Sequence, residues 1–516
     1  MLPPLIEHRR RCELRKDVGT AASAVPPSVA RRPKLHGCQA PEGVHPHVNR
    51  AGERGVTIAL VAVAIFSIIA MAGLSIDIGT LYEASAEAQR AADAGALAAA
   101  RVISISGVTG DLTPHVPHWT AVCGGSTSPA STAATTVAQL NTIAGTSNAT
   151  VTVTYGGTTV QNCASQPISF AVNPTVTVLV KQTNLPTYFS RIWGRSGSSV
   201  SATATAEVFN PSNSGAYSAS GSVVPVQPRC VKPWVVPNQD PGNTGAVNTF
   251  VSAVDGSITN QGVYQSDGGV IGETFNLIAD CVPGTANCLP PLSPAGHIYN
   301  NPPTRNVTTP PIPVPNLEYV PALVQGNAVA VPTGGSCSIT GAYQSAIAGC
   351  DQTTAYTCGT TNATFGATQV NLAENPVWPS VVGGDTPVAV QCLINQASGQ
   401  DTINPGTVTA PVFPFQIQAG AGNPLVTAGV VSSNAFITSS NSIVTIPIAD
   451  FGVGALVPPQ PAVTIVGFLQ VFINSINGGT GAMNVTVINV SGCGDNTANP
   501  PLNGTSPVPV RLITPP

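Results

Sequence analysis

Few side chains in this sequence could support catalysis. Only three histidines follow residue 76 and could act as a general base, His115, His118 and His297, and no serine lies in a G-x-S-x-G motif. His115 and His118 are spaced like a pair of metal ligands, but Pro117 interrupts the helix that would align the two rings. The sequence therefore predicts no enzyme, no cofactor and no metal site.

Two weaker kinds of ligand chemistry stay open as alternatives. Asp240, Asp255 and Asp267 lie beside Gly and Asn in sequence that could form calcium-binding turns, although such turns more often contact only water. Trp234 and Trp378 could stack on a sugar ring, although buried tryptophans are more common. A pair of carboxylates of the glycosidase type is also possible, because its two members need not be close in the chain.

The cysteines favour disulfides over a metal site. Ten of the 12 cysteines follow the apolar segment described below, and none has the C-x-x-C spacing of a zinc site. An even number in Ser-, Thr-, Asn- and Gly-rich sequence is typical of an oxidising compartment, so we expect up to five disulfides of undetermined pairing. The candidates are Cys123, Cys163, Cys230, Cys281, Cys288, Cys337, Cys350, Cys358, Cys392 and Cys493.

The composition excludes several classes of protein. Of 516 residues only 8% are charged, whereas a typical soluble domain carries about 25%, so an ordinary cytosolic enzyme is not expected. The net charge of −4 gives no basic surface for nucleic acid, and no nucleic-acid partner is predicted. Ten of the 19 basic residues lie in the first 54 positions, which indicates that the two parts of the chain face different surroundings.

One segment is long and apolar enough to span a bilayer. Residues 56–76 read VTIALVAVAIFSIIAMAGLSI, and as a helix they would extend about 31 Å, the thickness of the hydrocarbon core. The next most apolar stretch, residues 462–473, is too short and reads as a core strand. Arg50 and Arg54 precede the span, and ten of the 12 cysteines follow it, so we expect a cytoplasmic N-terminus and an extracytoplasmic C-terminal part.

Two alternatives concern the N-terminal region. Ala70-Met71-Ala72 is an A-x-A pattern after an apolar run, so the segment could be a signal peptide and the product a secreted protein. Against this, the lead of about 55 residues is long for a signal peptide. One interpretation is that residues 1–54 form a disordered cytoplasmic tail. The other is that the protein begins near Val44 or Val48, from a codon other than Met.

The apolar span continues into an alanine-rich stalk. Ten of the seventeen positions from Ala84 to Ala100 are alanine, the strongest helix former, and no proline lies between Arg54 and Arg101. We therefore expect one helix through both segments. Its narrow face of small residues could pack on another membrane helix or on the ectodomain of the same chain, and the sequence leaves both possibilities open.

Several motifs surround the apolar span: Glu53-Arg54-Gly55 before it, and Asp77-x-Gly79-x-Leu81-Tyr82 and Gln89-x-Ala91-Ala92-Asp93-Ala94 after it. Together they resemble the N-terminal domain of the TadG-like proteins of the Tad (tight adherence) Flp-pilus assembly system. A weaker resemblance follows in Val176-x-Val178-x-Val180, Tyr188-Phe189, Gly194 and Val200-x-Ala202-x-Ala204-x-Ala206, which is similar to the β-rich stretch after the helix in such proteins. The positions that carry the main resemblance, and that we also expect to take part in helix packing, are Glu53, Gly55, Asp77, Gly79, Tyr82, Gln89, Ala92 and Asp93.

The resemblance implies a single-pass protein of the bacterial inner membrane. Its implied partners are the lipid bilayer and other Tad/Flp pilus assembly membrane proteins, with surface glycans as a further possibility. The chain departs from the family at Ser85 and Ala88, where relatives carry a basic and a bulky apolar residue. Leu60 stands where pilins have a glutamate, so no processing by prepilin peptidase is expected. No von Willebrand A domain is expected either, because Asp255-Gly256-Ser257-Ile258-Thr259 lacks a flanking apolar strand and helix.

The predicted fold class is α+β. A transmembrane and stalk helix over 55–105 follows the tail 1–54, a small α+β module occupies 107–210, and 211–227 form a linker. The rest, 228–516, is expected to form a mostly-β, disulfide-containing ectodomain, a sandwich or a barrel. In the module we expect a helix over 131–144 and strands over 151–155, 175–181 and 199–209. In the ectodomain we expect strands over 408–417, 425–437, 443–448, 462–473 and 483–490, the last two forming a hairpin.

Overall fold

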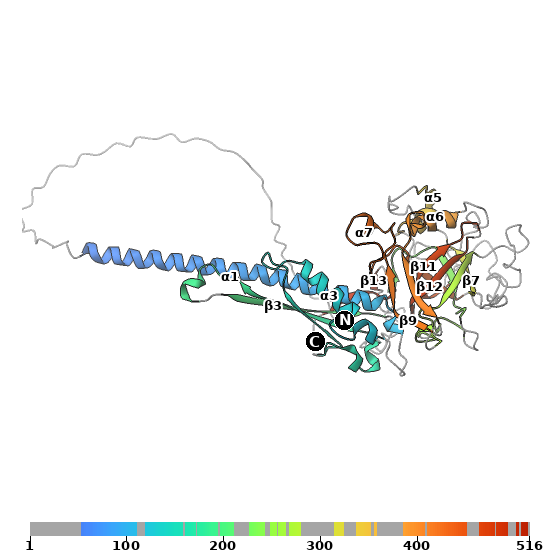
Figure 1. Ribbon diagram of the computed structural model, residues 1–516, viewed down its shortest axis with the longest axis horizontal. Helices are drawn as coiled ribbons and strands as arrows, with labels where there is room; N and C mark the ends of the chain where they lie inside the picture. Colours follow the sequence, from blue (N-terminus) through green and yellow to red (C-terminus); the bar gives the residue numbers. More distant parts are fainter. Residues whose placement is uncertain are drawn as a thin grey trace, which may run out of the picture. The chain divides into compact units, whose positions relative to one another are not determined.

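The computed structural model of the chain contains one long helix, a helix-covered sheet and a closed β-barrel (Figure 1). The structure describes residues 53–110, 119–157, 160–171, 173–194, 197–210, 226–242, 248–254, 256–264, 268–279, 314–322, 324, 337–351, 356–358, 385–407, 410–450, 464–479, 481–493, 502–504 and 507–513.

Helix α1 spans Glu53–Ser104 without interruption, as the sequence predicts. It is the one helix of the described residues that is long and apolar enough to cross a membrane. Its first half leaves large apolar side chains uncovered, from Val56, which is 65% exposed, to Ile76, which is 50% exposed. Its second half is different, because Ala88, Ala92, Ala96 and Ala99 are fully buried.

The second half of α1 packs into what we call the stalk module. Its four-stranded sheet has the order β1-β2-β3-β14, and all three strand pairs are antiparallel. The elements are η1 (Val108–Gly110), α2 (Thr120–Cys123), α3 (Pro129–Leu140), β1 (Thr150–Tyr155), η2 (Cys163–Ser165), η3 (Ile168–Ala171), β2 (Thr175–Leu185), η4 (Ser190–Trp193), β3 (Ser198–Val208) and β14 (Val510–Ile513). The predicted helix and three strands are therefore present, and β14 adds a strand from far along the sequence.

Small side chains allow α1 to approach this sheet closely. Across β2 and β3, Val178 pairs with Ala204, and Val180 pairs with Ala202, so one face alternates valine with alanine. These residues form one core with the alanines of α1 and α3. Gly95 is in close contact with both α3 and β2, because a Cβ there would lie 3.0 Å from the Ala134 carbonyl oxygen and 3.4 Å from Val178 Cγ1. The alanine-rich sequence thus serves packing within the chain along this face.

The ectodomain is built around a closed barrel of order β10-β11-β12-β6-β7-β5. A barrel was one of the two folds predicted for it, the other being a sandwich. Its strands are β5 (Trp234–Pro237), β6 (Thr274–Ala279), β7 (Asn316–Pro321), β10 (Ile443–Asp450), β11 (Thr464–Ile476) and β12 (Met483–Gly492). Branched aliphatic and aromatic side chains of these strands fill one core. The predicted hairpin is the antiparallel pair β11–β12. Trp234 lies in this core with no exposed surface, so it is not a sugar-stacking platform.

Smaller elements complete the ectodomain, and one of them differs from expectation. They are the parallel pair β4 (Val226–Pro228) and β13 (Leu502–Gly504), the antiparallel pair β8 (Thr402–Thr407) and β9 (Ala410–Gln418), and α5 (Gly341–Ala348), α6 (Asp385–Leu393), η7 (Gln396–Ser398) and α7 (Pro424–Thr427). The strand expected over 425–437 is wrong, because α7 begins there. Asn423 caps this helix by accepting a hydrogen bond from the Leu425 N–H, and Pro424 occupies the first helical position.

The described part of the chain contains four disulfides, all among the predicted cysteines. They join Cys123 to Cys163 in the stalk module and, in the ectodomain, Cys230 to Cys350, Cys337 to Cys392, and Cys358 to Cys493. The other two candidates, Cys281 and Cys288, lie outside the described residues. Three of the four crosslinks hold segments of the barrel domain that are 55 to 135 residues apart, as expected of a domain in an oxidising compartment.

A buried lysine caps helix α5. The Lys232 Nζ donates hydrogen bonds to the carbonyl oxygens of Ile347 and Gly349, each at 2.6 Å, and to that of Ala346 at 3.3 Å. Burial lowers the pKa of this amine to about 7. The neutral amine still carries two N–H groups, so most of the capping is kept in both protonation states.

We expect Lys232 to make the free energy of unfolding depend on pH above about pH 7. The unfolded lysine has a pKa near 10.5, so between pH 7 and 10.5 the unfolded chain binds more protons than the folded one. The free energy of unfolding should therefore rise with pH in this window, and this rise should be smaller in Lys232→Met. Urea unfolding at several pH values measures it, with Lys181→Met, an exposed lysine on β2, as the control. Equal pH slopes in Lys232→Met and the original protein would contradict the assignment.

Candidate functional site

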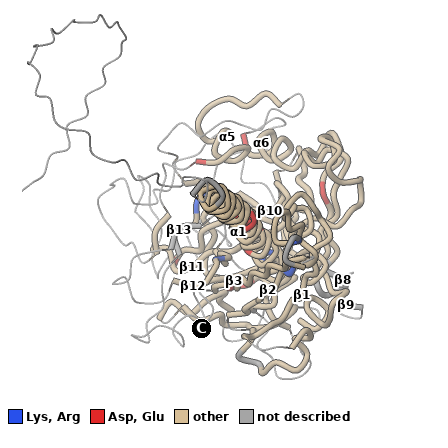
Figure 2. The backbone as a smooth tube through the Cα atoms, turned by 90° about the vertical axis from the view of Figure 1, so that its left-hand side faces the viewer, with Lys and Arg blue, Asp and Glu red and all other residues tan. Residues whose placement is uncertain are grey.

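The candidate site is the part of α1 where exposed apolar residues give way to the stalk module. The whole segment 56–72 has exposed or half-exposed side chains, and Gly73 is the first buried residue after it. Charged positions are sparse along the described backbone (Figure 2). Asp77 is the first acid of α1 after Glu53, and it is only 6% exposed. This burial needs an explanation, because an unpaired buried carboxylate is costly.

Asp77 is held by three successive backbone N–H groups. Its Oδ1 accepts hydrogen bonds from Tyr188 N at 3.0 Å and Phe189 N at 3.3 Å, and its Oδ2 accepts them from Phe189 N at 3.2 Å and Ser190 N at 2.8 Å. These N–H groups open the short helix η4, where the first donors have no partner within the helix. The carboxylate therefore caps η4 from another element, with charge-assisted hydrogen bonds.

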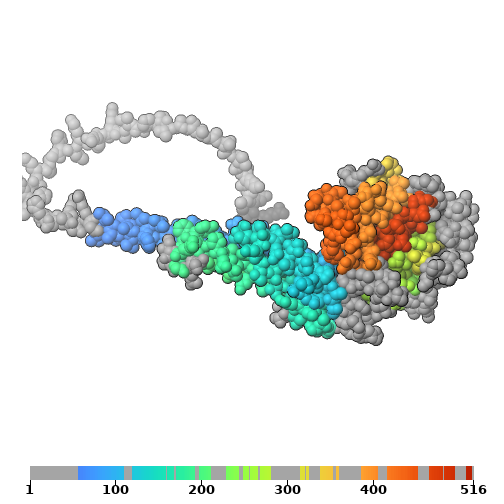
Figure 3. Space-filling model, in the orientation of Figure 1, coloured from blue at the N-terminus to red at the C-terminus, as the bar shows by residue number. Residues whose placement is uncertain are grey.

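The segment that Asp77 holds connects β2 to β3, and we call residues 186–194 the hairpin tip. One helical turn before Asp77, Gly73 makes room for it, because a Cβ at Gly73 would lie 2.6 Å from Cγ of Phe189. The Phe189 ring thus packs directly on the backbone of α1. In Figure 3 the green end of the sheet lies against the blue surface of the helix. Gly73 and Asp77 together fix the tip to α1.

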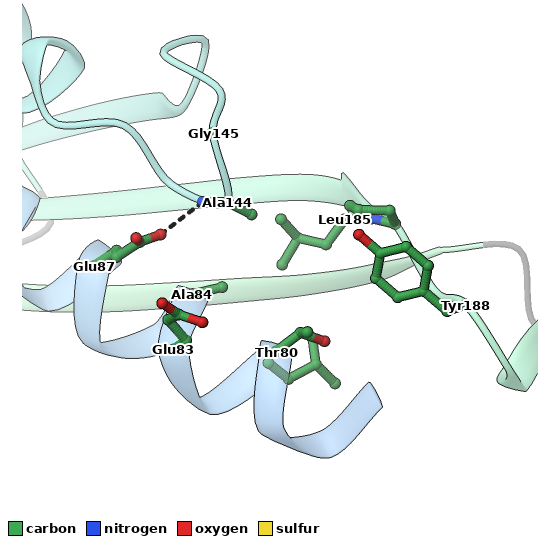
Figure 4. A pocket seen from close by; sticks show the side chains of 10 residues that line it. Thr80, Glu83, Ala84, Glu87, Ala144, Gly145, Leu185 and Tyr188 are labelled. Atoms are coloured by element: carbon green, nitrogen blue, oxygen red, sulfur yellow. Dashed lines mark hydrogen bonds between the residues drawn. The ribbon is translucent and has the colours of Figure 1, made fainter. Parts of the chain in front are cut away.

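A groove of about 300 Å³ lies directly beyond the tip (Figure 4). Its walls come from α1, from the loop after α3 and from the start of the tip, and its lining residues are Thr80, Leu81, Glu83, Ala84, Glu87, Ala144, Gly145, Leu185, Pro186 and Tyr188. The Glu87 Oε2 accepts a hydrogen bond from Ala144 N at 2.7 Å, which ties the loop to the helix. Glu83 is exposed, one turn nearer the apolar segment.

The groove is lined by two glutamates but by no histidine or cysteine. Within the described part of the chain, no group of three His, Cys, Asp or Glu side chains could hold a metal ion. Asp240, a calcium candidate, accepts hydrogen bonds from Gly242 N and Asn260 Nδ2 and is buried. The remaining candidates for catalysis or ligand binding, His115, His118, His297, Asp255, Asp267 and Trp378, lie outside the described residues.

The predicted helix-packing residues fall on different faces of α1. Ala92 is fully buried in the core of the stalk module, and half-buried Asp93 accepts a hydrogen bond from Gln89. Gln89 also donates to the carbonyl oxygen of Thr203 on β3, at 3.3 Å. These three positions therefore serve contacts within the chain.

Gly79 and Tyr82 lie on the uncovered face. An added Cβ at Gly79 would meet nothing within 4 Å, and Tyr82 is 75% exposed. Ser75 and Ala86 are also exposed and lie on the same face, at a spacing of four and seven residues from Gly79. Glu53 and Gly55 belong to the first turn of α1. The face around Gly79 is the part of the predicted surface that stays open to a partner.

Sequence reasoning missed the connection between Asp77 and the hairpin tip. It singled out Asp77 and the pair Tyr188-Phe189, but as separate features more than 110 residues apart. The position of Asp77 could have indicated the connection. An isolated acid at the end of an apolar run requires hydrogen-bond donors from elsewhere in the fold.

Comparison with known proteins finds a family match within α1. Residues 55–102 match the family described as "Putative Flp pilus-assembly TadE/G-like", in agreement with the resemblance drawn from the sequence. The match covers nearly all of α1. No curated protein and no solved structure matches the chain.

Proposed function

We propose that this TadE/G-like chain is a single-pass membrane component of Flp/Tad pilus assembly. In this proposal residues 56–76 anchor it in the bacterial inner membrane. The stalk module and the disulfide-containing barrel domain lie on the extracytoplasmic side, where the ectodomain makes surface contacts. The protein acts by anchoring and scaffolding, and we assign it no catalytic step.

The observation that carries the proposal is the division of α1 into two halves. The TadE/G-like match covers one continuous helix whose first half exposes apolar side chains and whose second half is the core of a folded module. A signal peptide does not need such a rigid connection, whereas an anchor that positions a scaffold does. The four disulfides support placement of the ectodomain on the oxidising side.

The uncovered face of α1 around Gly79 is the proposed contact for another Tad assembly membrane protein. It combines the small residues Ser75, Gly79 and Ala86 with the exposed ring of Tyr82. Small residues allow a second helix to approach closely, and close packing is the main source of affinity between helices in a membrane.

Co-purification tests this contact. We expect Gly79→Leu to reduce recovery of a Tad assembly membrane protein by about tenfold, since a few lost packing contacts amount to roughly 1.4 kcal/mol. The change should leave the fold intact, because nothing surrounds Gly79 within the chain. Ala164→Leu, at an exposed position of η2, is the control. Full recovery with Gly79→Leu would remove the assembly contact from this face.

A secreted adhesin or carbohydrate-binding protein is the alternative function. Cleavage after Ala72 would leave Asp77 and the stalk module in place, so the fold of the ectodomain is compatible with release. The two functions differ in where the mature chain begins.

A further inference from the structure

We infer that the hairpin tip is a second membrane-contacting element, which lies in the headgroup region of the bilayer beside the end of the α1 span. This inference rests on the proposed anchoring of α1 in the membrane. In this inference the outer surface of the tip contacts lipid, not a protein partner.

The depth of the tip follows from its contact with α1. Phe189 packs against Gly73, and Gly73 lies three residues, or about 4.5 Å, inside the end of the apolar segment. Leu74 and Ile76 follow Gly73 in the sequence and flank this contact around the helix, and they are 53% and 50% exposed. A bilayer that covers these side chains must also reach the tip, because the tip is fixed to the same turn of the helix.

The backbone N–H groups of the tip that face Asp77 are already hydrogen-bonded at this depth. Three backbone N–H groups would be costly to remove from water, but all three donate to Asp77. Asp77 in turn would be costly near hydrocarbon, and its four hydrogen bonds replace its hydration. Each group therefore reduces the cost of placing the other at the membrane surface.

The outer side chains of the tip suit the boundary between water and lipid. Tyr188 is 60% exposed, and its ring has the apolar body and polar end that favour this region. Arg191 is exposed on η4, where its guanidinium can reach lipid phosphates. Farther along α1, the exposed Glu83 and the half-exposed Glu87 mark the aqueous side. We therefore place the outer limit of the membrane contact at the groove, where the Tyr188 ring and these glutamates line the same hollow.

Tryptophan quenching by lipid tests the position of the tip. The full chain is reconstituted in two sets of phosphatidylcholine and phosphatidylglycerol vesicles, whose acyl chains carry bromine either close to the headgroup or near the chain ends. Three variants, Tyr188→Trp, Tyr82→Trp and Phe66→Trp, each replace one exposed aromatic residue by another. The emission that each new tryptophan adds to the original protein is compared with that in unbrominated vesicles.

We expect the added emission of Tyr188→Trp to be quenched about threefold more than that of Tyr82→Trp, which lies beyond the interface. Phe66→Trp, at the middle of the span, reports anchoring itself through quenching by bromine near the chain ends. If Phe66→Trp is quenched while Tyr188→Trp behaves like Tyr82→Trp, the tip inference is overturned and the anchor stands. If Phe66→Trp is not quenched, anchoring fails, and the inference fails with it. Shielding of Tyr188→Trp from aqueous acrylamide without quenching by bromine would show a protein cover and also overturn it.

Discussion

Gly95→Leu is expected to destabilise the stalk module strongly. An added Cβ at Gly95 already lies 3.0 Å from the Ala134 carbonyl oxygen, 3.2 Å from the Ala138 Cβ and 3.4 Å from Val178 Cγ1, so three further carbons would have to displace α3 or β2. Overpacking of this kind costs about 1–3 kcal/mol or more, which exceeds the gain of about 1 kcal/mol from replacing a helical glycine. Chemical unfolding followed by the emission of Trp119, which is buried in the same core, measures the loss.

Gly79→Leu is the matched control on the same helix. Because nothing lies within 4 Å of an added Cβ there, the substitution should leave the unfolding midpoint unchanged or raise it slightly. The two variants compare the two faces of α1, because Gly95 lies on the face that packs within the chain and Gly79 lies on the uncovered face. A similar loss of stability in both would mean that the face around Gly79 is also covered by the chain.

Asp77→Ala is expected to release the hairpin tip from α1. The substitution removes every acceptor of the hydrogen bonds from Tyr188, Phe189 and Ser190, so these amides must find water or remain unpaired. Hydrogen exchange of the three amides should accelerate by about tenfold or more, while exchange in the barrel strands stays unchanged. Asp77→Asn should give an intermediate acceleration, because one acceptor oxygen remains and the negative charge is lost.

Asp93→Ala provides the control for losing an acid from α1. Its carboxylate accepts a hydrogen bond from Gln89 on the same helix and makes none to the tip in the described structure. Exchange at residues 188–190 should therefore be unaffected in this variant. Slow exchange of these three amides in Asp77→Ala would contradict the proposal that Asp77 holds the hairpin tip on α1.

The sequence predicted most of the elements because their patterns are local. The apolar run and the alanine-rich run give α1, and alternating valines give β2. The barrel strands β10, β11 and β12 were expected within a few residues of their bounds. The expected strand after Asn423 failed because the capping and proline signals for a helix outweighed the β-propensity of the valines that follow.

Contacts between distant segments could not be predicted in the same way. The cysteines were found, but the partners of each depend on the path of the chain through the barrel. Whether the alanine face served the chain or a partner also depends on tertiary structure, and its central part, with Ala92 and Gly95, packs within the chain. The β14 strand joins the sheet of the stalk module from residues 510–513, and no local pattern indicates this.

The most direct test of the account is the N-terminus of the mature chain together with its location. We predict that the chain in the membrane fraction begins upstream of Val56, with its disulfide-containing ectodomain open to protease added from the extracytoplasmic side. A mature chain that begins at Gly73 and is recovered in the soluble fraction would contradict the anchor on which the account rests.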